Sequence, residues 1–595
     1  AAPADTRAIV DSIEIPSLYH AGGVRAAVPG ALLDRIDLMP GAYDAGHGRA
    51  LGGLLLADTR ALPDKGIHGY VGADLLDASA MLSAAIGSRF RVAVAGRYGY
   101  LDRLAGALHV ASGLYQIPGY DDYQAKITVA LRSGEELGLL LLGADDRVAM
   151  SPIAGASRTI DTSFQRIALR YGRVLSDEEW TIEPWAGRDE RHHHERFGLV
   201  PAALDVASLT YGLRADWRRR LGSRVKLSVG IDWQGTMSSL ARSGSLTIPA
   251  REGDLALFGQ PPGAEVNTDD WRTHIADVAP HATLDVRAGP VTIRPGLRVD
   301  AFLIEGSRLT PRAGATPAIG FTRVEWAIDP RLLVIWRAGS RVTLSAAGGV
   351  YHQPPAAEEL GAVFGNPSLG PSRAVHATLG AIVRAHAALT VDAVGFYKHI
   401  DGLAARSAAP TPIRAQALVP DGTGQVYGAQ LTVRLETIKS PAGDFFGWIA
   451  YTLSRSERLD VPGAAPRLFD FDQTHVLSAV ASWTWRGWSI GLRLRYATGM
   501  PRTPVVSSIY DASGDRYDPV FGAHNGERLP AFVQLDARVA KRIQIGLTSI
   551  DLYVDAQNVT NQRNAEEVVY SFDLRRRDYI GGLPFLAVAG ARLGF

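Results

Sequence analysis

The chain of 595 residues contains no cysteine at all. This absence excludes a disulfide framework and any metal site built on thiolates. The sequence also lacks a run of about 18 consecutive apolar residues, the length that a membrane-spanning helix needs. Hydrophobic residues make up 46% of the chain and the mean hydropathy is +0.01. A membrane β-barrel hides its apolar residues by alternation, so this average is compatible with both a soluble all-β protein and a membrane barrel.

The sequence has no excess of charge of one sign, and its first residues do not resemble a leader. Lys plus Arg total 62 and Asp plus Glu total 61. Such a balance gives no global field for nucleic acid, and we expect no nucleic-acid partner. The chain begins at Ala1 with neither a basic stretch nor an apolar run, so we expect no signal peptide within this sequence. If the protein is exported, the leader, or more than the leader, has already been removed.

From about residue 66 onward, apolar and polar residues alternate with a period of two. In 225–233, the odd-numbered residues are apolar, whereas the even-numbered ones are Lys, Ser, Gly and Asp. The preceding segment 211–217 alternates in the same way, and a short turn with Gly222 and Ser223 joins the two. Similar hairpins recur at 291–301 and 476–496. This period predicts β-strands with one apolar and one polar face.

The connections between these strands alternate between two lengths. Tight turns are expected at 219–223, 288–290 and 338–340. Long segments rich in Gly, Pro and charge are expected at 235–272, 353–372, 402–424 and 500–530. Outer-membrane barrels have short periplasmic turns and long external loops, whereas sandwiches lack this asymmetry, so the pattern favours a membrane barrel. Residues 61–595 spread over about 22 strands leave roughly 24 residues for each strand with its connection.

The chain ends on an amphipathic strand. Apolar residues occupy alternate positions from Phe585 to Phe595. A terminal strand ending in Phe resembles the signal read by the barrel-assembly machinery, which we expect as a partner. Tryptophans near strand ends suit the aromatic girdles that contact membrane lipid, although ordinary β-propensity explains any single one of them. These tryptophans are Trp233, Trp336, Trp483, Trp485 and Trp488.

Residues 8–60 do not follow the barrel pattern. They contain Val-Asp-Ser-Ile-Glu-Ile-Pro at 10–16, Leu-Asp-Arg-Ile-Asp at 33–37, and Pro-Gly followed by Tyr-Asp-Ala-Gly-His-Gly-Arg-Ala-Leu-Gly-Gly at 40–53. The segment resembles the second half of the plug domain of TonB-dependent receptors. Ser12 stands where that family usually has Gly, and His47 where it commonly has Tyr.

Further motifs of the same family follow in order and at family-like spacing. They lie at 351–355, 366–373, 427–430, 447–452, 471–477, 498–501, 535–538 and 555–561. Each is short, but the ordered set covers most of the chain. The resemblance implies an all-β fold, namely a transmembrane antiparallel β-barrel of about 22 strands with a partial N-terminal plug domain. Residues 1–60 would form the C-terminal part of the plug and residues 61–595 the barrel.

The resemblance also implies a function. We expect a receptor in the outer membrane of a Gram-negative bacterium that takes up an unidentified scarce nutrient, coupled to a TonB-type protein. A complete member carries a signal peptide, a TonB box and the first plug strands upstream of residue 8, and the sequence begins as if inside the plug. The TonB-type partner is therefore expected if that segment exists. A shortened plug sheet would need a missing segment, another protein or lumen-facing barrel groups as its partner. The alternative is an uncoupled structural or scaffolding barrel, within a larger complex or with a surface partner.

We identify no catalytic constellation in the sequence, so we expect neither an enzyme nor a cofactor. His192, His193 and His194 are weak candidates for a metal site in an external loop, because three consecutive histidines cannot all point at one ion. A solvated polar loop is the favoured interpretation of these three histidines. Gly361–Gly370 lacks the Lys-Ser/Thr of a phosphate loop. Candidates for contacts with substrate or within the plug region are Tyr19, His20, Arg35, Asp37 and Arg49.

Aspartates form one further candidate set. Asp34, Asp37, Asp470 and Asp472 are potential cation ligands. Because arginines and aspartates are equally frequent on the polar faces of the strands, ion pairs that hold plug to barrel are the favoured interpretation.

Overall fold

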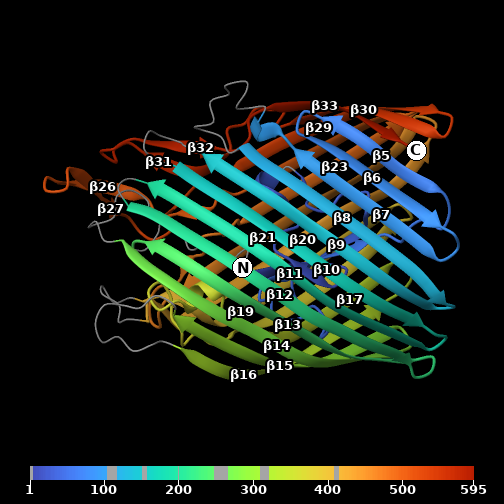
Figure 1. Cartoon of the computed structure of the whole chain (residues 1–595), viewed down its shortest axis with the longest axis horizontal. Helices are drawn as coiled ribbons and strands as arrows, with labels where there is room; N and C mark the ends of the chain where they lie inside the picture. The colour runs from blue at the N-terminus through green and yellow to red at the C-terminus, as the bar shows by residue number, and fades with distance from the viewer. Residues whose placement is uncertain are drawn as a thin grey trace.

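The computed structural model describes residues 5–23, 25–103, 117–150, 157–197, 200–246, 266–308, 320–407 and 415–595. In this part of the chain, 22 antiparallel strands form a closed barrel (Figure 1). They are β5 (Ile67–Asp74), β6 (Asp77–Ile86), β7 (Phe90–Gly99), β8 (Ile117–Arg132), β9 (Glu135–Met150), β10 (Ser157–Val174), β11 (Glu178–Phe197), β12 (Val200–Arg220), β13 (Val225–Gly244), β14 (Asn267–Ala288), β15 (Val291–Arg308), β16 (Phe321–Arg337), β17 (Val342–Gln353), β18 (Ser372–His386), β19 (Leu389–Arg406), β20 (Leu418–Ser440), β21 (Gly443–Leu459), β23 (His475–Trp485), β24 (Trp488–Ala497), β29 (Phe532–Ile545), β30 (Thr548–Gln557) and β33 (Leu586–Gly594).

The alternation predicted from the sequence divides each strand between the outside and the lumen. On β13, Val229, Ile231 and Trp233 are exposed on the outer surface, whereas Asp232 is buried inside the barrel. A closed barrel leaves no unpaired strand edge. An outer wall that contacts lipid requires this, because lipid offers no hydrogen-bond partners to backbone groups. In the part of the chain that the structure describes, no helix is long and apolar enough to cross a membrane.

The two ends of the barrel differ in their connections, as expected. Turns of two to four residues lie at one end, for example between β14 and β15 and between β16 and β17. The long connections lie at the other end (left in Figure 1), and they contain η4 (Ala357–Leu360), β22 (Arg467–Leu468), β25 (Pro501–Arg502), β26 (Val505–Asp511), β27 (Arg516–Phe521), β28 (Glu527–Arg528), β31 (Ala565–Tyr570) and β32 (Arg577–Gly581). Among the described residues, one connection at this end is also tight, β5–β6.

Two of the expected long loops are shorter than predicted. β13 continues to Gly244 and β14 begins at Asn267, so much of the segment 235–272 is strand. In the same way β19 reaches Arg406 and β20 begins at Leu418, within the segment 402–424. The strands extend through polar residues, so the loss of apolar alternation did not mark their ends. Residues 247–265 and 408–414 lie outside the described residues.

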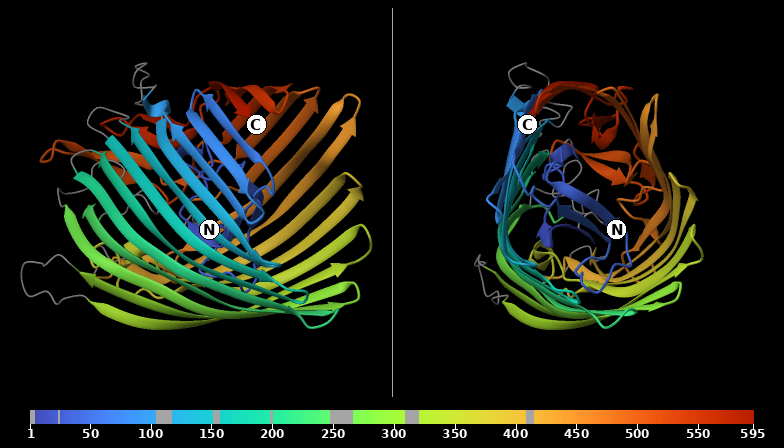
Figure 2. Two further views of the ribbon diagram at one scale, coloured as in Figure 1. Left: turned by 45° about the vertical axis from the view of Figure 1, so that its right-hand side comes forward. Right: turned by 90° about the vertical axis from the view of Figure 1, so that its right-hand side faces the viewer.

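The segment before the barrel forms a separate sheet in the lumen (Figure 2). Its strands are β1 (Thr6–Val10), β2 (Ile13–Ile15), β3 (Leu33–Met39) and β4 (Gly53–Thr59), in the order β2-β1-β4-β3, with the short helix η2 (Ala21–Gly23) between β2 and β3. We call residues 5–60 the lumen sheet. The β1–β2 turn places Asp11 and Ser12 at φ 45° and 76°, a left-handed conformation that favours Gly. This explains why a glycine suits the position of Ser12.

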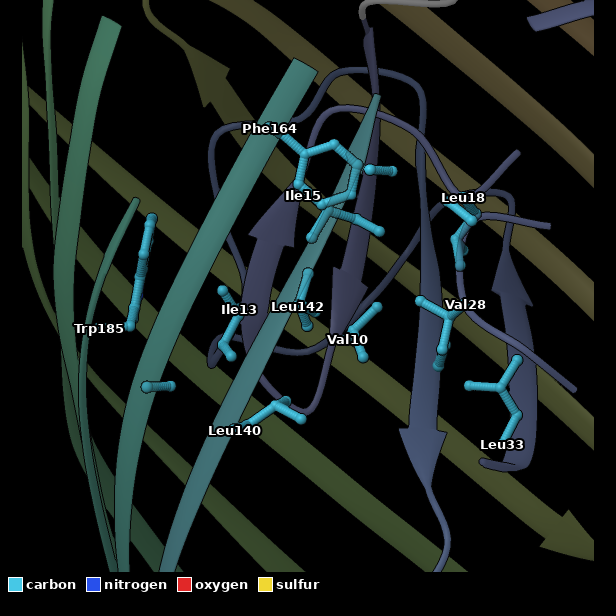
Figure 3. Packing of buried hydrophobic residues seen from close by; sticks show 14 residues of the cluster. Val10, Ile13, Ile15, Leu18, Val28, Leu33, Leu140, Leu142, Phe164 and Trp185 are labelled. Atoms are coloured by element: carbon cyan, nitrogen blue, oxygen red, sulfur yellow. The ribbon is translucent and has the colours of Figure 1, made fainter. Parts of the chain in front are cut away.

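One face of the lumen sheet packs on the barrel wall. Val10, Ile13 and Ile15 contact an apolar patch of the wall that includes Leu142 and Phe164 (Figure 3). These wall residues belong to β9 and β10, whose lumen faces are therefore not uniformly polar. Burying such side chains stabilises the contact by roughly 1.5–3 kcal/mol each.

The last strand closes the barrel. β33 pairs antiparallel with β5, and the backbone of Phe595 exchanges two hydrogen bonds with Gly69, of 2.9 and 3.0 Å. The ring of Phe595 lies on the outer face and is 42% exposed. The terminal residue therefore completes the seam between β33 and β5.

Candidate functional site

The candidate site is the interface between the lumen sheet and the inward faces of the barrel strands. Its centre is an ionic network of two arginines and three aspartates. Arg49, from the loop before β4, lies 3.0 Å from Asp232 and 2.9 Å from Asp277. Arg298, on β15, lies 3.0 Å from each of these two carboxylates and 2.7 Å from Asp300. The network thus joins the lumen sheet to β13, β14 and β15.

The burial of this network determines its energetics. The side chain of Arg298 is fully buried, and Asp277 and Asp300 are almost so. Taking charges out of water is costly, and only close pairing compensates for it. Removal of one partner would leave the others buried without compensation, so the network acts as a unit.

Glycines allow the lumen sheet to approach the barrel this closely. A Cβ atom on Gly48 would lie 2.5 Å from Nε of Arg298, and one on Gly46 would lie 2.9 Å from Nη2 of Arg214. A side chain at either position would push the arginine away. The Gly-His-Gly pattern of 46–48 is therefore a packing requirement of the interface.

A second cationic anchor lies beside the network. Arg331 of β16 donates hydrogen bonds to the backbone carbonyls of Asp44 and His47. Its guanidinium lies over the rings of Tyr43 and Tyr351, at 5.0 and 4.2 Å from their centroids. Arg331 thus holds the loop 43–47 through both hydrogen bonds and cation–π contacts.

His20 forms a separate latch on β8 and β9. Its side chain is fully buried, with Nε2 3.1 Å from Asp122 and Nδ1 3.0 Å from Asp146. Since each ring nitrogen faces a carboxylate oxygen, both nitrogens donate, which is the arrangement of an imidazolium. Burial opposes the charge, but the hydrogen bonds to the two aspartates raise the pKa of His20. The ring also stacks on Tyr120, with centroids 4.7 Å apart.

Further polar contacts surround the sheet. Arg25 pairs with Asp74 and Asp77 at 2.7 and 2.8 Å. Arg166 donates to the backbone carbonyl of Glu14, and His376 contacts the carbonyl of Leu51. Barrel side chains thus serve as partners for the lumen sheet. Lumen-facing barrel groups were one of the three kinds of partner expected for it, besides a missing segment and another protein.

Of the predicted site residues, the structure brings His20 and Arg49 to the interface and leaves the others apart from it. Tyr19 is 54% exposed. Arg35 and Asp37 pair with each other at 2.5 Å on β3, an exposed edge strand of the lumen sheet. Asp34 lies exposed on the same strand.

We expected the three consecutive histidines in an external loop, but this prediction was wrong. They lie within β11. His192 and His194 lie on the outer face and both contact Asp205, at 2.6 and 2.9 Å. His193 lies on the inner face, 2.7 Å from Glu195. Strand alternation therefore separates the middle imidazole from its neighbours. Within the described ranges, no group of three or more His, Cys, Asp or Glu residues is arranged to hold a metal ion.

Asp470 and Asp472 do not link plug to barrel as the ion-pair interpretation expected. Both are buried in the connection between β21 and β23, where they pair with Arg467 and Arg528. Sequence reasoning identified Asp232, Arg298 and Asp300 only as members of polar strand faces and missed Asp277, Asp122 and Asp146. A charged residue at an inward position was the only available signal, and many lumen residues share it.

The comparisons with known proteins agree with this architecture. A family model described as "TonB dependent receptor-like, beta-barrel" matches residues 97–559. The chain is similar in structure to the ferric citrate transporter FecA, with 16% identity, a TM-score of 0.71 and coverage of 100% of this chain and 88% of that one. The chain is also similar in structure to the ferric yersiniabactin uptake receptor FyuA from Yersinia pestis, with 13% identity, a TM-score of 0.72 and coverage of 99% of this chain and 88% of that one. The FrpB iron transporter from Neisseria meningitidis is similar as well, with 15% identity, a TM-score of 0.68 and coverage of 99% of this chain and 92% of that one. No curated protein matches the chain in sequence.

Proposed function

We propose that this chain, which belongs to the TonB-dependent receptor family, takes up a small ligand across the outer membrane by energy-coupled movement of its lumen sheet. The lumen sheet belongs to the C-terminal part of a plug domain, to which we assign residues 1–60, and residues 61–595 act as the barrel. Members of the family are outer-membrane proteins of Gram-negative bacteria. A TonB-type protein would supply the force, and no covalent chemistry by the chain is involved.

The observation that carries this proposal is the buried ionic network around Arg49 and Arg298. Breaking a buried ion pair by removing one partner costs about 3–5 kcal/mol. Separation of the lumen sheet from β13–β15 by thermal motion would therefore be rare. A lumen sheet bound in this way would leave its place in the barrel only when an external force acts on it.

The ligand class proposed here is a ferric chelate. Support comes from the similar structures, which include a ferric citrate transporter and a ferric yersiniabactin uptake receptor.

The test uses a tether between the lumen sheet and the barrel. A Cβ atom on Gly296 would lie 3.1 Å from the Cβ of Ala45, close to the spacing of about 3.5–4.5 Å in a disulfide. Because the chain has no cysteine, the double variant Ala45→Cys, Gly296→Cys forms one defined cross-link. Each single cysteine variant is the matched control.

Uptake of radioactive iron is measured in cells that express the protein from its own gene, with iron supplied as ferric citrate or ferric yersiniabactin. We expect gene-dependent accumulation that a protonophore abolishes, that the oxidised tether blocks and that a reducing agent restores. Accumulation that resists both the protonophore and the tether would indicate an uncoupled barrel. No gene-dependent accumulation of either chelate would contradict the ferric class.

A further inference from the structure

The seam between the first and the last barrel strand is the shortest ladder of the wall. β33 pairs with β5 over five residues, from Gly590 with Asp74 to Gly594 with Tyr70. The next shortest ladders of the barrel, β5–β6 and β16–β17, have seven pairs each. At the end with the long connections the seam stops at Asp74, the last residue of β5. The seam is therefore the joint of the wall with the fewest backbone hydrogen bonds.

A side-chain bridge crosses the last strand at this end of the seam. The hydroxyl of Tyr553, on β30, donates to Oδ2 of Asp74, on β5, at 2.9 Å. β33 lies between these two strands, and its Gly590 leaves room for the bridge. A Cβ atom on Gly590 would lie 2.5 Å from Cζ of Tyr553 and 2.6 Å from the Cβ of Asp74. The bridge thus joins β5 to its second neighbour across the seam.

Arg25 of the lumen sheet binds the same aspartate. Its Nη2 lies 2.7 Å from Asp74, and its Nε lies 2.8 Å from Asp77, the first residue of β6. Both carboxylates are almost fully buried, and among the described residues Arg25 is their only ion-pair partner. Two like charges buried side by side repel each other, and burial of either one without a cation is costly. Arg25 therefore offsets an electrostatic repulsion that is located beside the seam.

The chain on both sides of Arg25 is anchored on the barrel wall. On one side, His20 lies between the aspartates of its latch on β8 and β9. On the other side, Arg97 of β7 donates to the carbonyl of Ala26 at 3.1 Å, and Gln124 of β8 donates to the carbonyl of Ala27 at 2.9 Å. These contacts fix the position of Arg25 relative to the wall, so its guanidinium restrains Asp74.

We propose that Arg25 is a clamp through which the lumen sheet keeps the barrel seam closed. It neutralises Asp74 and Asp77, so that Asp74 can accept the hydroxyl of Tyr553 and hold β5 against β33. Without Arg25 the two carboxylates repel each other, Asp74 turns away from Tyr553, and the short ladder opens from the end with the long connections. This proposal concerns the closure of the wall and does not depend on the ligand that crosses the lumen.

The test measures hydrogen exchange of backbone amides by mass spectrometry on the whole protein in lipid vesicles. Exchange of an amide in a ladder reports how often that ladder opens. The readout covers residues 69–74 and 590–595, and the β16–β17 ladder is the internal reference. The test variant is Arg25→Gln. The matched control is Arg49→Gln, which also removes a cation that joins the lumen sheet to the barrel, but at β13 and β14, away from the seam.

We expect Arg25→Gln to accelerate exchange at the seam by about tenfold, the equivalent of one lost charge-assisted hydrogen bond. Exchange in the β16–β17 ladder should not change, which also shows that the variant is folded. Arg49→Gln should leave the seam as it is in the wild type. Exchange at the wild-type rate in Arg25→Gln would overturn the proposal. Equal acceleration by Arg49→Gln would also overturn it, because the effect would then be a general loosening of the lumen sheet.

Two further variants separate the charge from the bridge. Adding Asp77→Asn to Arg25→Gln removes one of the two like charges, so we expect exchange at the seam to return towards the wild-type rate. Tyr553→Phe removes the bridge and keeps every charge, so it should accelerate exchange at the seam on its own. A failure of Asp77→Asn to slow the exchange, or a wild-type rate in Tyr553→Phe, would contradict the clamp.

Discussion

Single buried charges hold the lumen sheet in place. Arg298 contacts Asp232, Asp277 and Asp300, yet it belongs to the barrel, and Arg49 brings the lumen sheet into the same network. A charged residue on an inward strand face gives no sign in the sequence of which partner it will meet. The candidate site was therefore predictable at Arg49 and His20 but not at the barrel residues that receive them.

We expect Arg298→Ala to destabilise the protein by about 3–5 kcal/mol, because it leaves three buried carboxylates without their shared cation. The matched control is Arg538→Ala, which removes a lumen arginine that is 46% exposed and paired with Asp555. The control should cost no more than about 1 kcal/mol, since water screens an exposed pair. Unfolding by guanidinium in lipid vesicles measures both values, and equal losses would contradict the role given to the network.

The latch at His20 should depend on pH. Its pKa is raised in the folded protein, so its stabilisation is fully present below the ordinary histidine pKa of about 6.5 and is lost as the pH rises through the raised value. Besides Asp122 and Asp146, the site contains Arg97, 3.4 Å from Asp122, which stays charged throughout. We expect hydrogen exchange in residues 17–27 to become faster, relative to the intrinsic rate, as the pH increases above this range. His20→Gln should exchange quickly at every pH; the same pH response in this variant would disprove the latch.

The sequence predicted the individual strands better than any other feature of the fold. The alternation in 225–233 predicted β13 and its two faces, because each apolar residue faces outward and each polar one inward. The ends of the strands were less predictable. β13 and β14 continue towards the long connections, where apolar residues such as Leu240 and Trp271 lie on the inner face and most outward residues are polar. The alternation of apolar outward and polar inward residues is lost there, so it did not mark the ends of the strands.

The two faces of β13 give a direct comparison. Val229 lies on the outer wall among other apolar residues, and Ser228 lies on the lumen face. We expect Val229→Arg to cost about 2–4 kcal/mol, because it places a charge in the hydrocarbon layer, and Ser228→Arg to cost far less. The folded fraction after reconstitution into lipid vesicles measures the difference. Equal folded fractions for the two variants would argue against a membrane barrel.

The terminal strand should matter more for assembly than for the finished barrel. Phe595 exchanges two backbone hydrogen bonds with Gly69 at the seam, but its ring contacts the exterior. We expect removal of Phe595, or its replacement by Asp, to slow insertion in cells while the inserted fraction keeps normal heat-modifiable mobility. Insertion at the wild-type rate would refute this role.

The whole molecule combines a rigid, closed wall with a lumen sheet that the wall holds through side chains. The family resemblance predicted the barrel and its strand number, whereas the assignment of the lumen segment to a plug domain stays a prediction. The resemblance did not predict how a short sheet finds partners, because this depends on residues far apart in the sequence, such as Glu14 and Arg166 or Leu51 and His376. The structure shows that barrel groups are those partners.

Ion conductance in planar bilayers tests this account most directly. The barrel with residues 5–60 removed, checked for folding by heat-modifiable mobility, is compared with the intact 595-residue chain and with the double variant Arg49→Ala, Arg298→Ala. The account predicts the lowest conductance for the intact chain, a several-fold increase on deletion of the lumen sheet, and intermediate or fluctuating conductance for the double variant. The same conductance with and without residues 5–60 would contradict the claim that the lumen sheet, held by the buried network, obstructs the barrel.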